Sequence, residues 1–122
     1  MERVMEQPNA VAQQGWQVLC TVDDLVPQSG VVAWLEGEQV ALFYLPQHSP
    51  AVYALGNRDP QSGANVIGRG IVGQLKGELV VAAPLYKQHF SLVTGQCVED
   101  PQQALATWAV RVNGVAVEIQ RG

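Results

Sequence analysis

Residues 52–95 decide the fold class, with the sequence VYALGNRDPQSGANVIGRGIVGQLKGELVVAAPLYKQHFSLVTG. Its apolar runs are short, and Gly, Pro, Asn and Asp separate them. GIVGQL and ELVVAA flank Lys76-Gly77, which is typical of a β-hairpin closed by a tight turn. Because no apolar periodicity of 3.6 residues runs through the stretch, it predicts strands rather than helices.

The same pattern continues on both sides of this stretch. VVAWLE and QVALFYL flank Gly37, and WAVRV and VAVEI flank Asn113-Gly114, for which we predict a type I′ turn. WQVLC from Trp16 predicts the first strand, and Thr21 begins a capping-box pattern for one helical turn. The stretch DPQQALA is a candidate for one more helical turn.

About nine short strands predict an all-β sandwich or small barrel of antiparallel strands with short helical turns. We expect one domain over residues 15–122, preceded by a flexible, Gln-rich tail at residues 1–14. Four large aromatic residues on the predicted strands are expected in the core: Trp16, Trp34, Phe43 and Trp108.

Composition excludes several classes of function. Of the 122 residues, 48% are hydrophobic and 15% are charged, as in ordinary globular domains. The formal net charge of −4 argues against nucleic acid as a partner, because phosphate binding needs a concentrated basic surface. No apolar run approaches the roughly 20 residues that span a bilayer, and the first residues do not resemble a secretory signal. We therefore expect a cytoplasmic protein without membrane contact.

The motifs of catalysis and metal binding are weak. Gly68, Gly70 and Gly73 spell G-x-G-x-x-G, but the residues that follow predict a hairpin rather than the helix that a dinucleotide site needs. Cys20 and Cys97 lack neighbours at ligand spacing and are expected to be free thiols. Neither histidine has a nucleophile beside it, and His48 is expected in an exposed loop.

Two loops within residues 52–95 resemble the cluster-binding loops of Rieske domains. The matching residues are Asn57, Pro60, Gly63 and Ala64 in the first loop, and Pro84, Phe90, Leu92, Thr94 and Gly95 in the second loop and its exit. Rieske domains hold a 2Fe–2S cluster with two Cys and two His. The resemblance puts Asp59 and Gln61, then Ala83 and Tyr86, at the four ligand positions. None of them supplies a thiolate or an imidazole, so we predict that this chain binds no cluster and no metal.

In the resembled fold the two loops meet at one tip of the domain. The residues that this would bring together are Arg58, Asp59, Gln61, Tyr86, Lys87, Gln88 and His89. An aromatic residue among cations favours a protein interface. The alternative is a solvated loop end in which Asp59 pairs with Arg58 or Lys87, and the sequence leaves both interpretations open.

Two longer segments narrow the resemblance. WQVLCTVDDLVPQSGVVAWLEGEQVALFYL and GELVVAAPLYKQHFSLVTGQCVED are similar to the small subunit of bacterial NAD(P)H-dependent assimilatory nitrite reductase. That resemblance implies a chain with no catalysis alone and no cofactor of its own. It also implies a large-subunit partner that carries FAD, a 4Fe–4S cluster and siroheme and reduces nitrite to ammonium. Other hypotheses are a Rieske-like electron carrier, which needs a cluster, and a cofactor-free stand-alone binding or regulatory module for another oxidoreductase.

Overall fold

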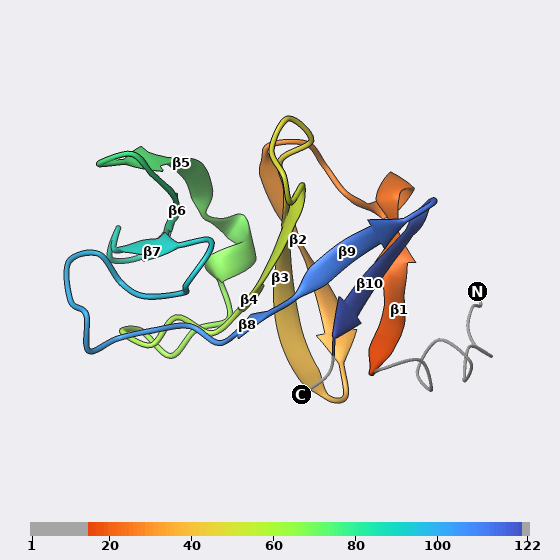
Figure 1. Cartoon of the computed structure of the whole chain (residues 1–122). Coiled ribbons are helices and arrows are strands. Elements are labelled where there is room, and N and C mark those ends of the chain that lie inside the picture. The colour runs from red at the N-terminus through yellow and green to blue at the C-terminus, as the bar shows by residue number, and fades with distance from the viewer. Residues whose placement is uncertain (1–14, 121–122) are drawn as a thin grey trace.

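The computed structural model describes residues 15–120, and its secondary structure confirms the all-β prediction (Figure 1). Ten strands and two short 3-10 helices make up the described part of the chain. The predicted flexible tail at residues 1–14 and the last two residues of the predicted domain lie outside it.

The strands form three antiparallel sheets, ordered β1-β10-β9, β2-β3-β4-β8 and β5-β6-β7. The elements are β1 (Trp16–Thr21), η1 (Val22–Asp24), β2 (Ser29–Leu35), β3 (Glu38–Tyr44), β4 (Val52–Gly56), η2 (Ile67–Arg69), β5 (Ile71–Leu75), β6 (Glu78–Ala82), β7 (His89–Ser91), β8 (Thr107–Trp108), β9 (Val110–Asn113) and β10 (Ala116–Gln120). In Figure 1 the β5-β6-β7 sheet stands to one side of the other two sheets.

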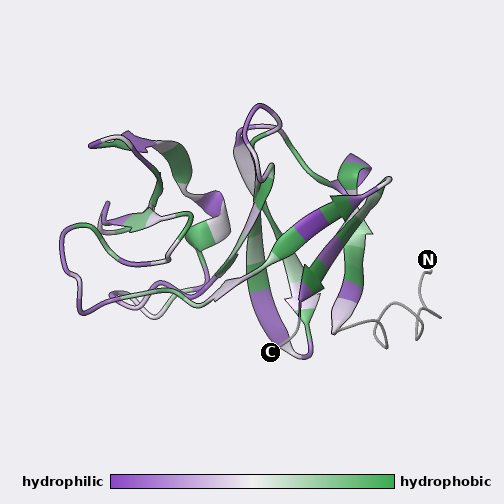
Figure 2. Ribbon diagram, in the orientation of Figure 1, coloured by the Kyte–Doolittle hydropathy of each residue, from purple (hydrophilic) through white to green (hydrophobic). Residues whose placement is uncertain are grey.

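The sheet containing β3 and β4 is buried on both faces. Val40 and Leu42 on β3 join a cluster that includes Val117 and Ile119 of β10. Ala41 and Phe43, which alternate with them, join a second cluster that includes Val81 and Phe90 of the β5-β6-β7 sheet. Because successive side chains of a strand point to opposite faces, a continuous apolar run such as VALF fills both clusters. Figure 2 shows these apolar strands beside largely hydrophilic connections.

Two of the three predicted tight turns are confirmed. Glu36 and Gly37 have φ angles of 53° and 84°, and Lys76 and Gly77 have 54° and 80°, so both central residues are left-handed as a type I′ turn requires.

The prediction for the third turn is wrong by one residue. Asn113 belongs to β9 and pairs with Ala116, which leaves Gly114 and Val115 as the loop. This register sets Arg111 opposite Glu118, and the two side chains form an ion pair of 2.6 Å. The cross-strand charge pair therefore favours the observed register over the one that Asn-Gly alone predicts.

The aromatic core prediction is correct for Phe43, which is fully buried, and wrong for Trp34, which is 63% exposed. Trp16 and Trp108 are half-buried. Strand β2 lies at an edge of its sheet and has apolar residues on both faces, so its sequence did not reveal which face turns outward. The capping box at Thr21 is present, whereas the DPQQALA stretch forms a turn without a helix.

The two ends of the described chain lie side by side. Trp16 on β1 pairs with Gln120 on β10 at the edge of one sheet. In Figure 1 both ends lie on the opposite side of the molecule from the β5-β6-β7 sheet. No helix within residues 15–120 is long and apolar enough to cross a membrane.

Two of the three G-x-G-x-x-G glycines, Gly68 and Gly70, lie in closely packed surroundings. Gly68 donates its N–H to Asn57 Oδ1 at 2.7 Å. A Cβ on Gly70 would stand 2.5 Å from Val81 Cγ2 and 2.6 Å from the backbone oxygen of Ala82, whereas a Cβ on Gly73 would meet nothing within 4 Å. Strand β5 follows Gly70 directly, in agreement with the predicted hairpin.

We predict that Gly70→Ala lowers the free energy of unfolding by about 1–3 kcal/mol, because the added methyl overlaps a strand backbone that cannot move aside. The matched control is Gly73→Ala, which should leave that free energy unchanged or raise it by up to about 1 kcal/mol by restricting the unfolded chain. Urea unfolding monitored by tryptophan fluorescence measures both. Equal losses in the two variants would contradict the packing role of Gly70.

Candidate functional site

The first loop (residues 57–66) is anchored at its base by Asn57. This side chain is buried, donates from Nδ2 to Gln39 Oε1 at 2.8 Å and accepts from the Gly68 N–H. Its backbone oxygen accepts the Ile67 N–H at 3.1 Å. One buried amide therefore joins the end of β4, the start of β3 and η2, and fixes where the loop leaves the sheet.

Asp59 closes the first loop from inside. Its Oδ1 accepts the Gln61 N–H at 2.8 Å, its own N–H donates to the Ala64 oxygen, and its oxygen accepts the Gly63 N–H at 2.7 Å. The residue is completely buried, and its Oδ2 has no hydrogen-bond partner in the described part of the chain. A short carboxylate that accepts a backbone N–H two residues ahead is a common way to stabilise a turn.

The second loop (residues 83–88) is also closed by its own backbone. The Ala83 N–H donates to the Gln88 oxygen at 2.8 Å, and the Lys87 N–H donates to the Ala83 oxygen at 3.0 Å. Lys87 has a φ of 59°. Leu85 and Tyr86 stand at the turn between these bonds, 55% and 58% exposed. The loop thus holds two large apolar side chains out into solvent.

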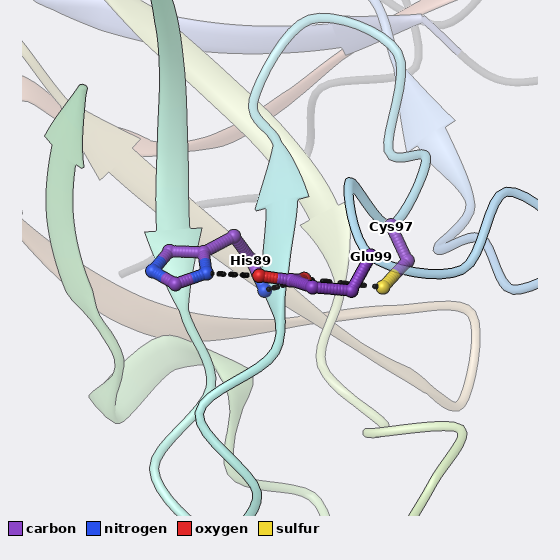
Figure 3. A network of polar contacts seen from close by, with 3 residues as sticks. All are labelled: His89, Cys97 and Glu99. Atoms are coloured by element: carbon purple, nitrogen blue, oxygen red, sulfur yellow. Dashed lines mark hydrogen bonds and ion pairs between the residues drawn. The ribbon is translucent and has the colours of Figure 1, made fainter. Parts of the chain in front are cut away.

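A polar network follows the second loop, formed by His89, Glu99 and Cys97 (Figure 3). Glu99 accepts the His89 backbone N–H at 2.8 Å and lies 2.6 Å from its Nδ1, while Cys97 Sγ donates to Glu99 Oε1 at 3.6 Å. Burial alone would raise the pKa of Glu99, but the bonds from the His89 N–H and imidazole together lower that pKa below its ordinary value. Burial raises the pKa of the Cys97 thiol. The network therefore favours a carboxylate beside a neutral thiol.

The two loops that carry the predicted tip residues share no direct polar contact in the described part of the chain. Within residues 15–120 no hydrogen bond or ion pair joins the two loops directly; Gln61 instead accepts from Gln103 Nε2 at 3.0 Å. Asp59 forms no ion pair with Arg58 or Lys87, contrary to the solvated-loop alternative. Because Asp59 is completely buried, its side chain cannot touch a partner, and that member of the predicted interface is corrected to a residue that shapes its loop.

The side chains at the four resembled ligand positions do not fit a 2Fe–2S cluster. Ala83 has no donor atom, Asp59 and Gln61 offer only carboxylate and amide oxygens, and Tyr86 is an exposed phenol. Iron–sulfur clusters need thiolates, with imidazole as the substitute on one iron. Cys97 is buried against Glu99 and its raised pKa disfavours a thiolate. Among the described residues, no three His, Cys, Asp or Glu are grouped so as to hold a metal ion.

Sequence reasoning missed Ile71 and Leu85. Ile71 is 76% exposed, although it begins an apolar strand. It pairs with Ala82, and Ala82 pairs with His89, so Ile71 stands in the cross-strand row that borders the second loop. The available signal was the residue pairing of the Lys76-Gly77 hairpin, which places Ile71 opposite the residue that precedes the loop.

We predict that Glu99→Gln lowers the free energy of unfolding at pH 7 by about 0.2–1 kcal/mol, the range of partly exposed ion pairs. The folded pKa of Glu99 lies below its ordinary value of 4.5, so the stabilising effect is present above pH 4.5 and disappears as the pH falls through the folded pKa. Urea unfolding at pH 7 and at pH 3 measures it. In a His89→Gln background the pH-dependent difference should shrink; a difference that stays constant across the pH range would refute the assignment.

Known proteins match almost the whole described chain. The Rieske-like [2Fe-2S] domain family matches residues 15–120. The chain is similar to the nitrite reductase (NADH) small subunit of Salmonella typhimurium, with 44% identity over 105 residues that cover 86% of this chain and 96% of that protein. The solution structure of the nitrite reductase [NAD(P)H] small subunit from Erwinia carotovora is 38% identical, with a TM-score of 0.75 over 90% of this chain and 84% of that one.

A further match has a different extent. The nitrite reductase [NAD(P)H] large subunit of Klebsiella oxytoca is 40% identical over 103 residues, which cover 84% of this chain and 10% of that protein. A domain of this kind therefore also occurs as a small part of a much longer chain.

Proposed function

Because the chain belongs to the family of nitrite reductase small subunits, whose fold is the Rieske-like domain, we propose that it is the non-catalytic small subunit of an NAD(P)H-dependent nitrite reductase. Its partner is the large subunit, and the complex reduces nitrite to ammonium. The observation that carries this proposal is the identity of 44% over nearly the full length of a small subunit.

The match to a large subunit supports the pairing. In the Klebsiella oxytoca protein, a domain similar to this one is part of the same chain as the large subunit. Domains that share one chain in one protein and occupy separate chains in another commonly work side by side. The proposal therefore requires a contact between this domain and the large subunit.

The chemistry is assigned to the partner. The donor set of the two loops fits no cluster, so the electrons are proposed to pass through FAD, a 4Fe–4S cluster and siroheme in the large subunit, in the cytoplasm. This chain would then contribute a surface that orders the large subunit or shields part of it.

We place the contact at the end of the domain that carries the two loops. The proposed contact residues are Arg58, Gln61, Tyr86, Lys87 and His89, and Asp59 supports them from inside the first loop. Arg58 and Lys87 form no ion pair with another described residue, so both charges are available to a partner.

We predict that the tagged chain co-purifies the large subunit from nitrite-grown cells, and that the eluate shows siroheme and flavin bands. The double variant Arg58→Glu and Lys87→Glu should reduce co-purification at least tenfold, because like charges then face the partner. Lys76→Glu is the control for a single charge reversal: it lies in the Lys76-Gly77 turn, at the far end of the β5–β6 hairpin from Ile71 and Ala82.

A colourless, partner-free eluate from the wild-type chain would overturn the subunit assignment in favour of a stand-alone binding module. A brown spectrum from the chain alone would overturn the donor-set argument. Retention of the partner by the double variant would remove the charged loop residues from the interface.

A further inference from the structure

An exposed apolar patch lies beside the second loop, formed by Ile71, Leu85 and Tyr86. These three side chains are 76%, 55% and 58% exposed. Leu85 and Tyr86 are on the loop that joins β6 to β7, and Ile71 pairs with Ala82, the last residue of β6 before that loop. Three large exposed apolar side chains therefore lie on the second loop and on the strand residue paired with the start of that loop. Exposed apolar side chains that occur together in this way mark interaction sites.

The backbone around the patch is held firmly. Gly70, next to Ile71, packs so closely on Val81 and Ala82 that no Cβ would fit. The second loop is closed by the two bonds between Ala83, Lys87 and Gln88. A surface whose backbone is already fixed loses little conformational entropy when a partner binds.

The charges next to the patch in the sequence are positive. Arg69 precedes Ile71 by two residues, Lys87 follows Tyr86 directly, and neither forms an ion pair with a described residue. Of the five Lys and Arg within residues 15–120, the four outside β9 lie between residues 58 and 87, although the whole chain has a net charge of −4. Glu99 bonds His89, the last residue of the cross-strand row, through both the backbone N–H and Nδ1 of that histidine. A partner surface that covers the patch would therefore match these charges if acidic side chains surround its apolar centre.

The sheet next to the patch stands apart from the sheet that holds the chain ends. The paired ends, Trp16 and Gln120, lie on the opposite side of the molecule from the β5-β6-β7 sheet (Figure 1). A domain tethered to a longer chain by those ends, as in the Klebsiella oxytoca protein, keeps this patch free to contact the rest of that chain.

We propose that Ile71, Leu85 and Tyr86 form the centre of the contact with the large subunit, and that they bind an apolar recess of that subunit rimmed by Asp and Glu side chains. This inference rests on the proposed function and deepens it: the centre lies on the second loop and β5, and the first loop forms the edge. Arg69 and Lys87 pair with the acidic rim.

The test is the affinity of purified variants for the purified large subunit, measured by biolayer interferometry at 50 and 500 mM NaCl. Ile71→Ser and Tyr86→Ala should each weaken binding at least tenfold. Val115→Ser is the matched control, because Val115 is 73% exposed in the β9–β10 turn. Added salt should weaken binding of the wild-type chain, and Arg69→Gln with Lys87→Gln should reduce that salt dependence. Thermal unfolding of each variant should match the wild type, since the replaced side chains are exposed.

The outcomes separate the two claims. If the wild-type chain binds and Ile71→Ser binds as well as Val115→Ser, the patch is overturned and the subunit assignment stands. If binding of the wild-type chain is independent of salt, the acidic rim is overturned. If the wild-type chain does not bind the large subunit at all, the proposed function fails and the patch fails with it.

Discussion

The rest of this structure depends on the burial of β3 and β4 on both faces. Their sheet separates two apolar clusters, one shared with the sheet that holds the chain ends and one shared with the sheet that holds the second loop. A polar replacement of Phe43 on one face, or of Leu42 on the other, would leave an unpaired polar group in a core. The first loop begins at the end of β4, and the second begins at the end of β6, whose Val81 packs against β3. The sheet that contains β3 and β4 therefore fixes where both loops start.

In a Rieske domain the metal cluster itself links the two loops. Here the residues at the ligand positions cannot bind a cluster, so the loops need another way to hold their shape. Each loop is instead closed by short-range bonds, the first by Asp59 and the second by the backbone between Ala83 and Lys87. The Asp59 carboxylate occupies a buried position where the resembled family has a cysteine. The frame of the fold has thus been kept while the element that needed a metal has been replaced by hydrogen bonds, and this leaves the exposed side of the loops available for contacts.

The strands, two of the turns and the loss of the cluster ligands could be predicted from the sequence, because each depends on residues close together in the chain. Tight turns at Gly37 and Gly77 follow from glycine conformation, and the ligand losses follow from residue chemistry alone. The failures concern choices between equivalent faces or registers. The sequence does not reveal that Trp34 is exposed, because its strand has apolar residues on both faces. The turn after Asn113 is shifted because Arg111 pairs with Glu118 across the sheet. Residue type predicts neither the burial of Asp59 nor the exposure of Ile71, because a carboxylate is usually exposed and an isoleucine is usually buried.

The pairing of Trp16 with Gln120 means that the chain enters and leaves the domain at the same end of the β1–β10 pair. Such a module can be joined to a larger chain at either end without rearrangement of its sheets. Once joined, docking becomes an intramolecular event at an effective concentration on the order of millimolar, so even a weak contact is mostly formed. As a separate chain the domain has no such advantage, and the same contact has to supply the whole affinity at the concentration of the free protein. We therefore expect stronger selection for affinity at the docking surface of a separate chain than at the same surface of a fused domain.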